Sequence, residues 1–130
     1  MFCSYKKYLL TNFCKKGELK IDINNSIIFI TGGASGIGKA LAFEAKSRGA
    51  KAIIIADMNM RGANQVAQKI GGMALKCDVS KSEDIVKCIQ KSNEAYGPID
   101  IYFSNAGIGI GDDPHWTAYG HSDESWEKGI

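Results

Sequence analysis

The sequence alternates short apolar runs with segments in which apolar residues recur every three or four positions. The first run, residues 27–30 (IIFI), is apolar at every position, which is typical of a strand covered on both faces of a parallel sheet. Similar runs follow at residues 52–56, 73–77 and 99–104, and helical spacing fills the intervals between them. Because the connections are short and crossovers are right-handed, this βαβαβαβ order predicts a parallel sheet covered by helices.

Local signals indicate where the helices begin and end. Gly49 is a natural stop for a helix that begins near Gly36. Ser80 and Glu83 have the spacing of a capping box, which predicts the start of the third helix, and Gly97 ends that helix. The sequence therefore predicts one α/β unit with three crossover helices.

Composition narrows the class of protein. The chain has 130 residues, 45% of them hydrophobic, and a net charge of +2, values that fit one ordinary soluble domain. This basic excess is too small to indicate nucleic acid or an anionic membrane as a partner, and no apolar run could span a bilayer. The four cysteines form no Cys-x-x-Cys pair, which favours reduced thiols and a cytoplasmic location. Residues 1–24 are interpreted as a poorly ordered N-terminal extension, and residues 25–130 as the folded unit.

A glycine-rich segment from Gly32 to Gly38 (GGASGIG) joins the first strand to the first helix. Glycines let the backbone approach an anion, and the helix N-terminus adds free N–H groups and a positive dipole end. The spacing of Gly33, Gly38 and Lys39 nearly matches a triphosphatase phosphate loop. Ala40, however, stands where that loop needs a hydroxyl for Mg²⁺. A small nucleoside-phosphate kinase is therefore disfavoured.

Polar residues end the other strands. Asp57 lies nineteen positions after Gly38, a spacing that matches the carboxylate which accepts hydrogen bonds from an adenosine ribose. Asp78 follows the third strand, and Asn105 follows the fourth. Because ligands in open α/β sheets bind at the carboxyl ends of strands, these residues are expected to converge on one crevice. The sequence thus favours a dinucleotide over a triphosphate.

Taken together, these motifs resemble the short-chain dehydrogenase/reductase family. The segment TGGASGIG begins at Thr31, and CDV and SNAG follow it in the family's order, over a region from about Ile23 to the C-terminus. The resemblance implies an oxidoreductase that transfers a hydride between NAD and a small-molecule alcohol or carbonyl substrate. It also implies a Rossmann-like, doubly wound parallel sheet, truncated after about four strands in the order 3-2-1-4.

The resemblance also assigns cofactor-binding roles. It implies that the glycine-rich loop wraps the pyrophosphate and the adjoining riboses, that Asp57 holds the adenosine ribose, and that Asp78 contacts the adenine. Asn105 either lines the path to the nicotinamide or stabilises the central sheet, and the sequence leaves both roles open. The complete implied set is Gly32, Ser35, Gly36, Ile37, Gly38, Asp57, Met58, Asp78, Val79, Asn105, Ala106 and Gly107.

Asp57 further predicts which dinucleotide binds. A carboxylate suits two ribose hydroxyls but repels the 2′-phosphate of NADP. Ser35 stands before Gly36, where NADP-preferring relatives often carry Lys or Arg. Arg61 is close in sequence and offers one route to NADP binding, but the carboxylate makes NAD the prediction.

The catalytic residues that the resemblance implies do not occur in these 130 residues. They are a Tyr whose pKa is lowered by a Lys four positions later, a Ser that holds the substrate oxygen, and a relay Asn. None of the five tyrosines has a Lys four positions on. We therefore expect a cofactor-binding half that is inactive alone and lacks the catalytic half and the usual oligomer interface. The alternative is a non-catalytic dinucleotide-binding or sensing module.

The segment after Gly107 has the composition of a loop, and Ser122 or Asp123 could cap a further helix. Asp112, Asp113 and His115 resemble metal ligands in that loop. Two carboxylates and one His in a loop are more often solvated surface, so no metal site is predicted.

Overall fold

The computed structural model describes residues 21–107 of the chain. Strands and helices alternate in it, as the sequence predicts. The elements are β1 (Ile27–Thr31), α2 (Gly36–Ser47), β2 (Ala52–Asp57), α3 (Met60–Ile70), β3 (Met73–Lys76), α4 (Ser82–Tyr96) and β4 (Ile101–Phe103).

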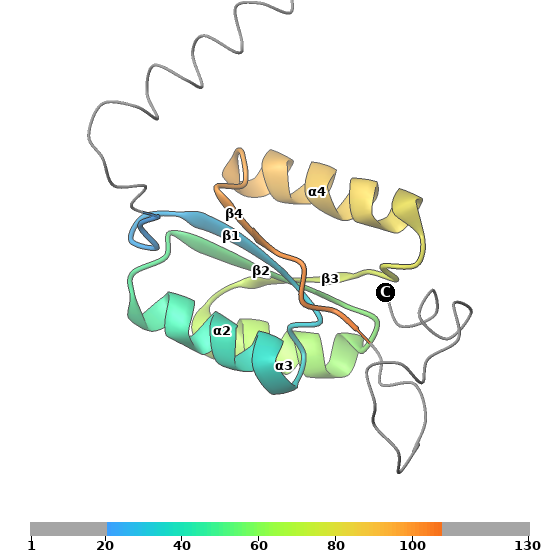
Figure 1. Ribbon diagram of the computed structural model, residues 1–130, viewed down its shortest axis with the longest axis horizontal. Coiled ribbons are helices and arrows are strands. Elements are labelled where there is room, and N and C mark those ends of the chain that lie inside the picture. The colour runs from blue at the N-terminus through green and yellow to red at the C-terminus, as the bar shows by residue number, and fades with distance from the viewer. Residues whose placement is uncertain (1–20, 108–130) are drawn as a thin grey trace, which may run out of the picture.

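The four strands form one parallel sheet in the order β3-β2-β1-β4 (Figure 1). Ile28 of β1 pairs with Ile53 of β2 on one side and with Ile101 of β4 on the other. After β3 the chain crosses back through α4 to reach the far side of β1. Helices α2 and α3 cover one face of the sheet and α4 the other (Figure 1). The predicted Rossmann-like, doubly wound topology is confirmed.

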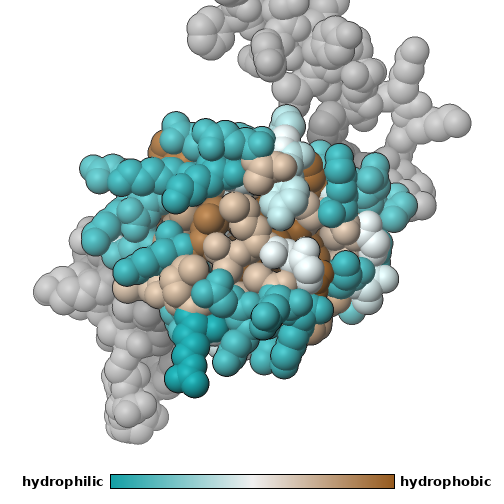
Figure 2. Space-filling model, turned by 180° about the vertical axis from the view of Figure 1, so that it is seen from behind, coloured by the Kyte–Doolittle hydropathy of each residue, from teal (hydrophilic) through white to brown (hydrophobic). Residues whose placement is uncertain are grey.

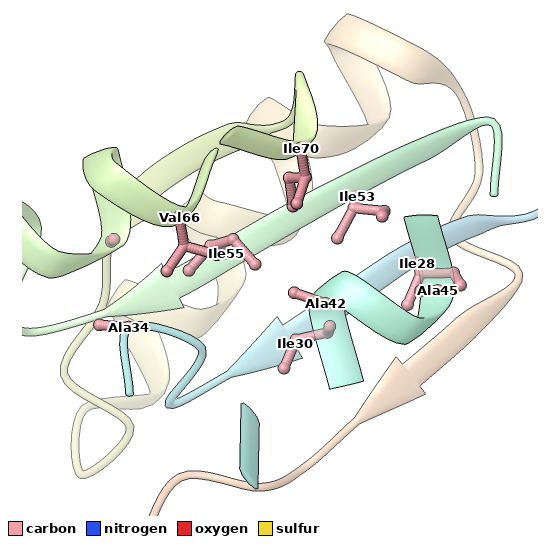
Figure 3. Packing of buried hydrophobic residues seen from close by; sticks show 10 residues of the cluster. Ile28, Ile30, Ala34, Ala42, Ala45, Ile53, Ile55, Val66 and Ile70 are labelled. Atoms are coloured by element: carbon pink, nitrogen blue, oxygen red, sulfur yellow. The ribbon is translucent and has the colours of Figure 1, made fainter. Parts of the chain in front are cut away.

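The sheet face beneath α2 and α3 is closed by aliphatic side chains (Figure 3). Isoleucines of β1 and β2 form its floor, and each fully buried isoleucine stabilises the fold by roughly 1.5–3 kcal/mol. Small alanines of α2 allow that helix to lie close to the sheet. The buried cluster consists of Ile28, Ile30, Ala34, Ala42, Ala45, Ile53, Ile55, Ala63, Val66 and Ile70.

The opposite face is covered by α4, which packs over β2 and β3. The cluster on this face includes aromatic and sulfur-containing side chains as well as aliphatic ones. The ring of Phe29 is fully buried and stacks on Tyr102 of β4, with centroids 5.0 Å apart and an interplanar angle of 11°. Tyr102 itself is 40% exposed. The buried cluster here consists of Ile27, Phe29, Ala52, Ile54, Ala56, Leu75, Cys77 and Cys88.

Two predicted element ends are wrong in detail. The capping box at Ser80 and Glu83 does not form, because α4 begins at Ser82 after Lys81, and the Ser80 hydroxyl instead donates to Asp78 Oδ1 at 2.6 Å. The fourth strand is shorter than the predicted residues 99–104. At its start the Asp100 carboxylate, rather than a backbone carbonyl, accepts the Ile27 N–H at 2.8 Å.

A turn leads the chain into β1. Asn25 has a φ of 62°, and its N–H donates to the carbonyl of Gly49 at 2.8 Å. Gly49 has a φ of 81°, a conformation that disfavours any other residue there, and a Cβ would also require the exposed Asn24 side chain to shift. The remainder of the predicted extension, residues 1–20, lies outside the described residues.

The surface seen from behind differs in hydropathy between its centre and its periphery (Figure 2). Apolar and neutral side chains gather at the centre of that view, with hydrophilic ones around them. Across residues 21–107, the structure contains no helix with both the length and the apolarity needed to cross a membrane.

Candidate functional site

The loop between β1 and α2 follows a path that favours glycine at two positions. Gly32 and Gly36 have φ values of 66° and 53°, in the left-handed region that other residues rarely adopt. A Cβ atom on Gly32 would lie 2.8 Å from the Cα of Ala106, and one on Gly38 would overlap the carbonyl oxygen of Gly32. The glycine-rich loop is therefore packed tightly between β1, the start of α2 and the segment after β4.

The first turn of α2 leaves backbone N–H groups available to a ligand. Ser35 is the N-cap, but its side chain makes no capping hydrogen bond, and the first turn has no acidic residue. Within residues 21–107, the first N–H of this helix with a backbone acceptor is that of Lys39, which donates to the Ser35 carbonyl at 3.1 Å. A Cβ on Gly36 would meet open space, and Ile37 is 74% exposed. The amides and the positive dipole end of α2 therefore fit an anionic group such as a pyrophosphate.

Asp57, the last residue of β2, joins two loops through its carboxylate. Oδ2 accepts the N–H of Ala34 at 3.0 Å, and Oδ1 accepts the N–H of Asn59 at 2.9 Å. The side chain is only partly buried, so lone pairs of both oxygens remain for hydroxyl donors. Met58, the next residue, is exposed. The structure thus places the carboxylate expected to hold a ribose directly beside the glycine-rich loop.

The carboxylate of Asp78, after β3, is held within its own turn. Oδ1 accepts the N–H and the hydroxyl of Ser80 at 3.1 and 2.6 Å, and Oδ2 lies 3.5 Å from Lys81 Nζ. The Ser80 hydroxyl, the Ser80 N–H and the nearby Lys81 charge hold the pKa of Asp78 below its ordinary value. Its own N–H donates to Asp84 Oδ2 at 3.2 Å. Val79 is half-buried beside it.

Asn105 uses its side chain to join the ends of β1 and β4. Its Nδ2 donates to the carbonyl oxygens of Thr31 and Gly32 at 3.2 and 3.4 Å. Of the two roles that the sequence left open for this residue, these contacts support the structural one. Ala106 is fixed beside Gly32 by the same arrangement, and the exposed Gly107 is the last described residue.

Thr31 is a residue that sequence reasoning did not select. Its hydroxyl accepts the N–H groups of Asn105 and Ala106 at 3.0 and 3.1 Å and donates to the carbonyl of Phe103 at 3.3 Å. The only signal in the sequence was its place as the first residue of the TGGASGIG motif. Thr31 therefore fixes the carboxyl end of β4 against that of β1.

These contacts bring the ends of all four strands to one edge of the sheet. Ala34 and Asp57 connect the loop after β1 to β2, and the Cys77 N–H connects β3 to the Asp57 carbonyl at 3.1 Å. In Figure 1 the strands end on the side where the loops to α2 and α3 begin. Hydrogen bonds thus join the glycine-rich loop to Asp57 and Asn105 at this edge, whereas Asp78 is held by contacts within its own turn and with Asp84.

The groups at this edge are backbone N–H donors and carboxylate acceptors, which suit anions and hydroxyls. Among residues 21–107, no three His, Cys, Asp or Glu side chains are placed to hold a metal ion. The metal-like loop around Asp112 and the helix expected after Ser122 lie outside the described residues. Burial raises the pKa of Tyr102, with smaller contributions from Cys77 and Cys88, which is opposite to what a general base near neutral pH requires.

Comparison with known proteins connects this edge to a family. The sequence profile described as short chain dehydrogenase matches residues 26–130. The (+)-cis,trans-nepetalactol synthase of Nepeta racemosa is 38% identical over 92 residues, which cover 69% of this chain and 34% of the synthase. Tropinone reductase-like 1 of Erythroxylum coca is 41% identical over 88 residues, 66% of this chain and 32% of that protein. The chain thus spans about a third of the length of these curated relatives.

A solved structure shows the same fold with a cofactor. The crystal structure of 3-ketoacyl-(acyl-carrier-protein) reductase from Brucella melitensis, complexed with NADH, is similar to this chain with a TM-score of 0.69 and 31% identity. The similarity covers 81% of this chain and 43% of the reductase. The profile match, these relatives and the shared parallel sheet show that the chain belongs to the short-chain dehydrogenase/reductase family of oxidoreductases.

Proposed function

We propose that this chain binds NAD at the carboxyl edge of its sheet, as part of an enzyme that oxidises an alcohol or reduces a carbonyl compound. The observation that carries the proposal is the Asp57 carboxylate, held next to the glycine-rich loop by the Ala34 N–H at 3.0 Å. An acceptor for hydroxyls and a helix N-terminus for phosphates then lie side by side, which matches the two halves of an adenosine diphosphate group. The NADH complex of the similar reductase supports the same cofactor class.

Each part of the edge has a separate task in this proposal. The N–H groups of the first turn of α2 bind the pyrophosphate, and Asp57 accepts hydrogen bonds from the adenosine ribose. Asp78 and Val79 face the adenine, while the segment after β4 lines the way to the nicotinamide. Bound NAD supplies the hydride acceptor, and its reduced form supplies the hydride donor. The reductases among the similar proteins favour a small alcohol or carbonyl compound as substrate.

Charge favours NAD over NADP. In NADP a 2′-phosphate takes the place of a ribose hydroxyl that could donate a hydrogen bond to Asp57. This phosphate would also bring a second negative charge close to the partly buried Asp57 carboxylate. Arg61 is a basic residue in the first turn of α3, the helix that follows. Among residues 21–107, however, Arg61 and Asp57 do not form an ion pair. We therefore propose NAD as the preferred dinucleotide.

Binding can be tested by thermal unfolding of the 130-residue chain with NAD, NADP, ADP-ribose and Mg-ATP. A ligand that binds only the folded state stabilises it by about 2.7 kcal/mol when its concentration is 100 times Kd. We expect NAD and ADP-ribose to raise Tm at lower concentrations than NADP, and Mg-ATP to have the weakest effect. A shift with Mg-ATP but not with NAD would refute the proposal and favour the kinase interpretation.

A further inference from the structure

The two carboxylates that end neighbouring strands have different kinds of partner. Asp78 accepts hydrogen bonds from Ser80 and lies near Lys81, both within its own turn. Asp57 instead accepts one N–H from its own turn, that of Asn59, and one from Ala34, a residue 23 positions earlier in the glycine-rich loop. Of these two carboxylates, only that of Asp57 therefore joins the glycine-rich loop to another strand end.

Packing around the Ala34–Asp57 hydrogen bond makes it a fixed contact. Ala34 is 9% exposed and belongs to the buried cluster beneath α3. A Cβ on Gly33 would lie 2.8 Å from Ile55 Cγ2, so the loop rests directly on β2. A Cβ on Gly62 would lie 3.1 Å from the Ala34 side chain, so the first turn of α3 closes over the same residue. While the loop keeps this path, the Ala34 N–H faces the Asp57 carboxylate.

Asn59 supports the same arrangement from the other side. Its N–H donates to Asp57 Oδ1 at 2.9 Å, and its side-chain oxygen accepts the N–H of Gly62 at 3.1 Å as the N-cap of α3. The carboxylate is thereby held between the start of α3 and the loop that precedes α2. Its orientation is set before any ligand arrives.

We propose that Asp57 is also a positioning residue, whose carboxylate holds the glycine-rich loop in the conformation that receives a pyrophosphate. The ligand part of this inference rests on the proposed function. In consequence, recognition of the ribose and recognition of the phosphates are coupled through one side chain. A substitution of Asp57 that is meant to admit NADP then also weakens the contacts between the glycine-rich loop and the phosphates of both NAD and NADP.

A set of variants separates positioning from simple ribose contact. Asp57→Ala removes both acceptors, whereas Asp57→Asn keeps one carbonyl oxygen. That oxygen is expected to face the buried Ala34 N–H, because the exposed Asn59 N–H can bond to water instead. Asp78→Ala is the matched control, since it removes a carboxylate from the next strand end without touching Ala34.

The first measurement is hydrogen exchange of the Ala34 amide in the ligand-free chain, with the amides of β1 and β2 as internal standards for global unfolding. We expect exchange at Ala34 to accelerate by at least about tenfold in Asp57→Ala, to be largely restored in Asp57→Asn, and to stay unchanged in Asp78→Ala. Unchanged exchange at Ala34 in Asp57→Ala would overturn the proposal, whatever the chain binds.

The second measurement uses NAD and an NAD analogue that lacks both hydroxyls of the adenosine ribose. If Asp57 only contacts the ribose, Asp57→Ala and the wild-type chain bind the analogue equally. We expect the variant to bind the analogue at least about tenfold more weakly, and Asp57→Asn to recover most of that loss. Failure of the wild-type chain to bind NAD would refute the proposed function, while the exchange experiment would still decide the positioning role.

Discussion

The two faces of the sheet are built from different side chains and are covered to different extents. Beneath α2 and α3 the buried cluster is entirely aliphatic, and two helices close it. Beneath α4 the cluster includes Phe29, Cys77 and Cys88, and a single helix packs over β2 and β3. On that side Tyr102 stays 40% exposed although its ring stacks on the buried Phe29.

This difference between the two faces of the sheet indicates which face holds the loops of the candidate site in place. The loop that precedes α2 and the turn that precedes α3 both belong to the two-helix face, and Ala34 is itself part of its cluster. The one-helix face contributes the turn around Asp78, which is stabilised by its own hydrogen bonds. Packing on the two-helix face therefore holds the loop that we propose binds the pyrophosphate, and packing on the other face has a weaker influence on that loop.

The largest effect is expected from a matched pair of substitutions in β2. Ile55 and Ile54 are adjacent, both fully buried, and point to opposite faces. We expect Ile55→Ala to reduce the free energy of unfolding by about 4 kcal/mol and Ile54→Ala by about 3 kcal/mol, because the one-helix face can collapse more readily into the cavity. Urea unfolding measures both values. An equal or larger loss for Ile54→Ala would remove the proposed difference between the faces.

A smaller effect is expected at the close approach of α2 to the loop. In Gly38→Ala the new methyl group meets the Gly32 carbonyl and lies 2.7 Å from Asn105 Nδ2, so we expect a loss of about 3 kcal/mol. Gly36→Ala is the control, because its methyl group meets open space and the cost, about 1 kcal/mol, comes from the left-handed backbone alone. If both variants lose the same stability in urea unfolding, steric contact is not what requires Gly38.

The smallest effect concerns pH and the thiols of the one-helix face. Burial, followed by the neighbouring Cys88, Asp84 and Asp78, raises the pKa of Cys77 from an ordinary 9.0 to about 12. Between these values the unfolded chain has lost the proton and the folded chain retains it, so stability falls as pH rises above 9. At pH 10 the loss from Cys77 amounts to roughly 1 kcal/mol.

The variant Cys77→Ala should show a shallower decline of unfolding free energy from pH 8 to pH 10 than the wild-type chain. A constant offset from the lost side chain does not affect this slope. Identical slopes would mean that the Cys77 thiol does not titrate differently in the folded and unfolded chains.

The fold was predictable from the sequence because its signals are local. The runs at 27–30 and 52–56 are apolar at nearly every position, and glycines mark the helix ends, so periodicity alone predicts the order of elements. The strand order followed from the family resemblance, and the structure confirms it. The position of Asp57 at the end of β2 was likewise predicted, because it directly follows the apolar run 52–56.

What could not be predicted depends on partners distant in sequence or on competition between neighbours. The Thr31 hydroxyl binds groups 72 to 75 positions away, and no spacing rule reveals that. Ser80 has the sequence context of a helix cap, but α4 begins only at Ser82, and the Ser80 hydroxyl donates to the carboxylate of Asp78, two positions earlier, in a turn that precedes the helix. The bond between Ala34 and Asp57 requires the exact path of the loop, which glycines permit but do not specify.

The position of β1 between β2 and β4 has a consequence for how the chain acquires its structure. β1 meets β2 after one helix, but the Thr31 hydroxyl meets the Asn105 N–H only across 74 residues. Loop closure over that distance is slow compared with the crossovers between neighbouring strands. During synthesis, β2 and β3 are therefore made before β4, and one edge of β1 stays unpaired until β4 is made. An unpaired strand edge can pair with other chains. We therefore expect the nascent chain to be more prone to aggregation before β4 pairs with β1 than after it.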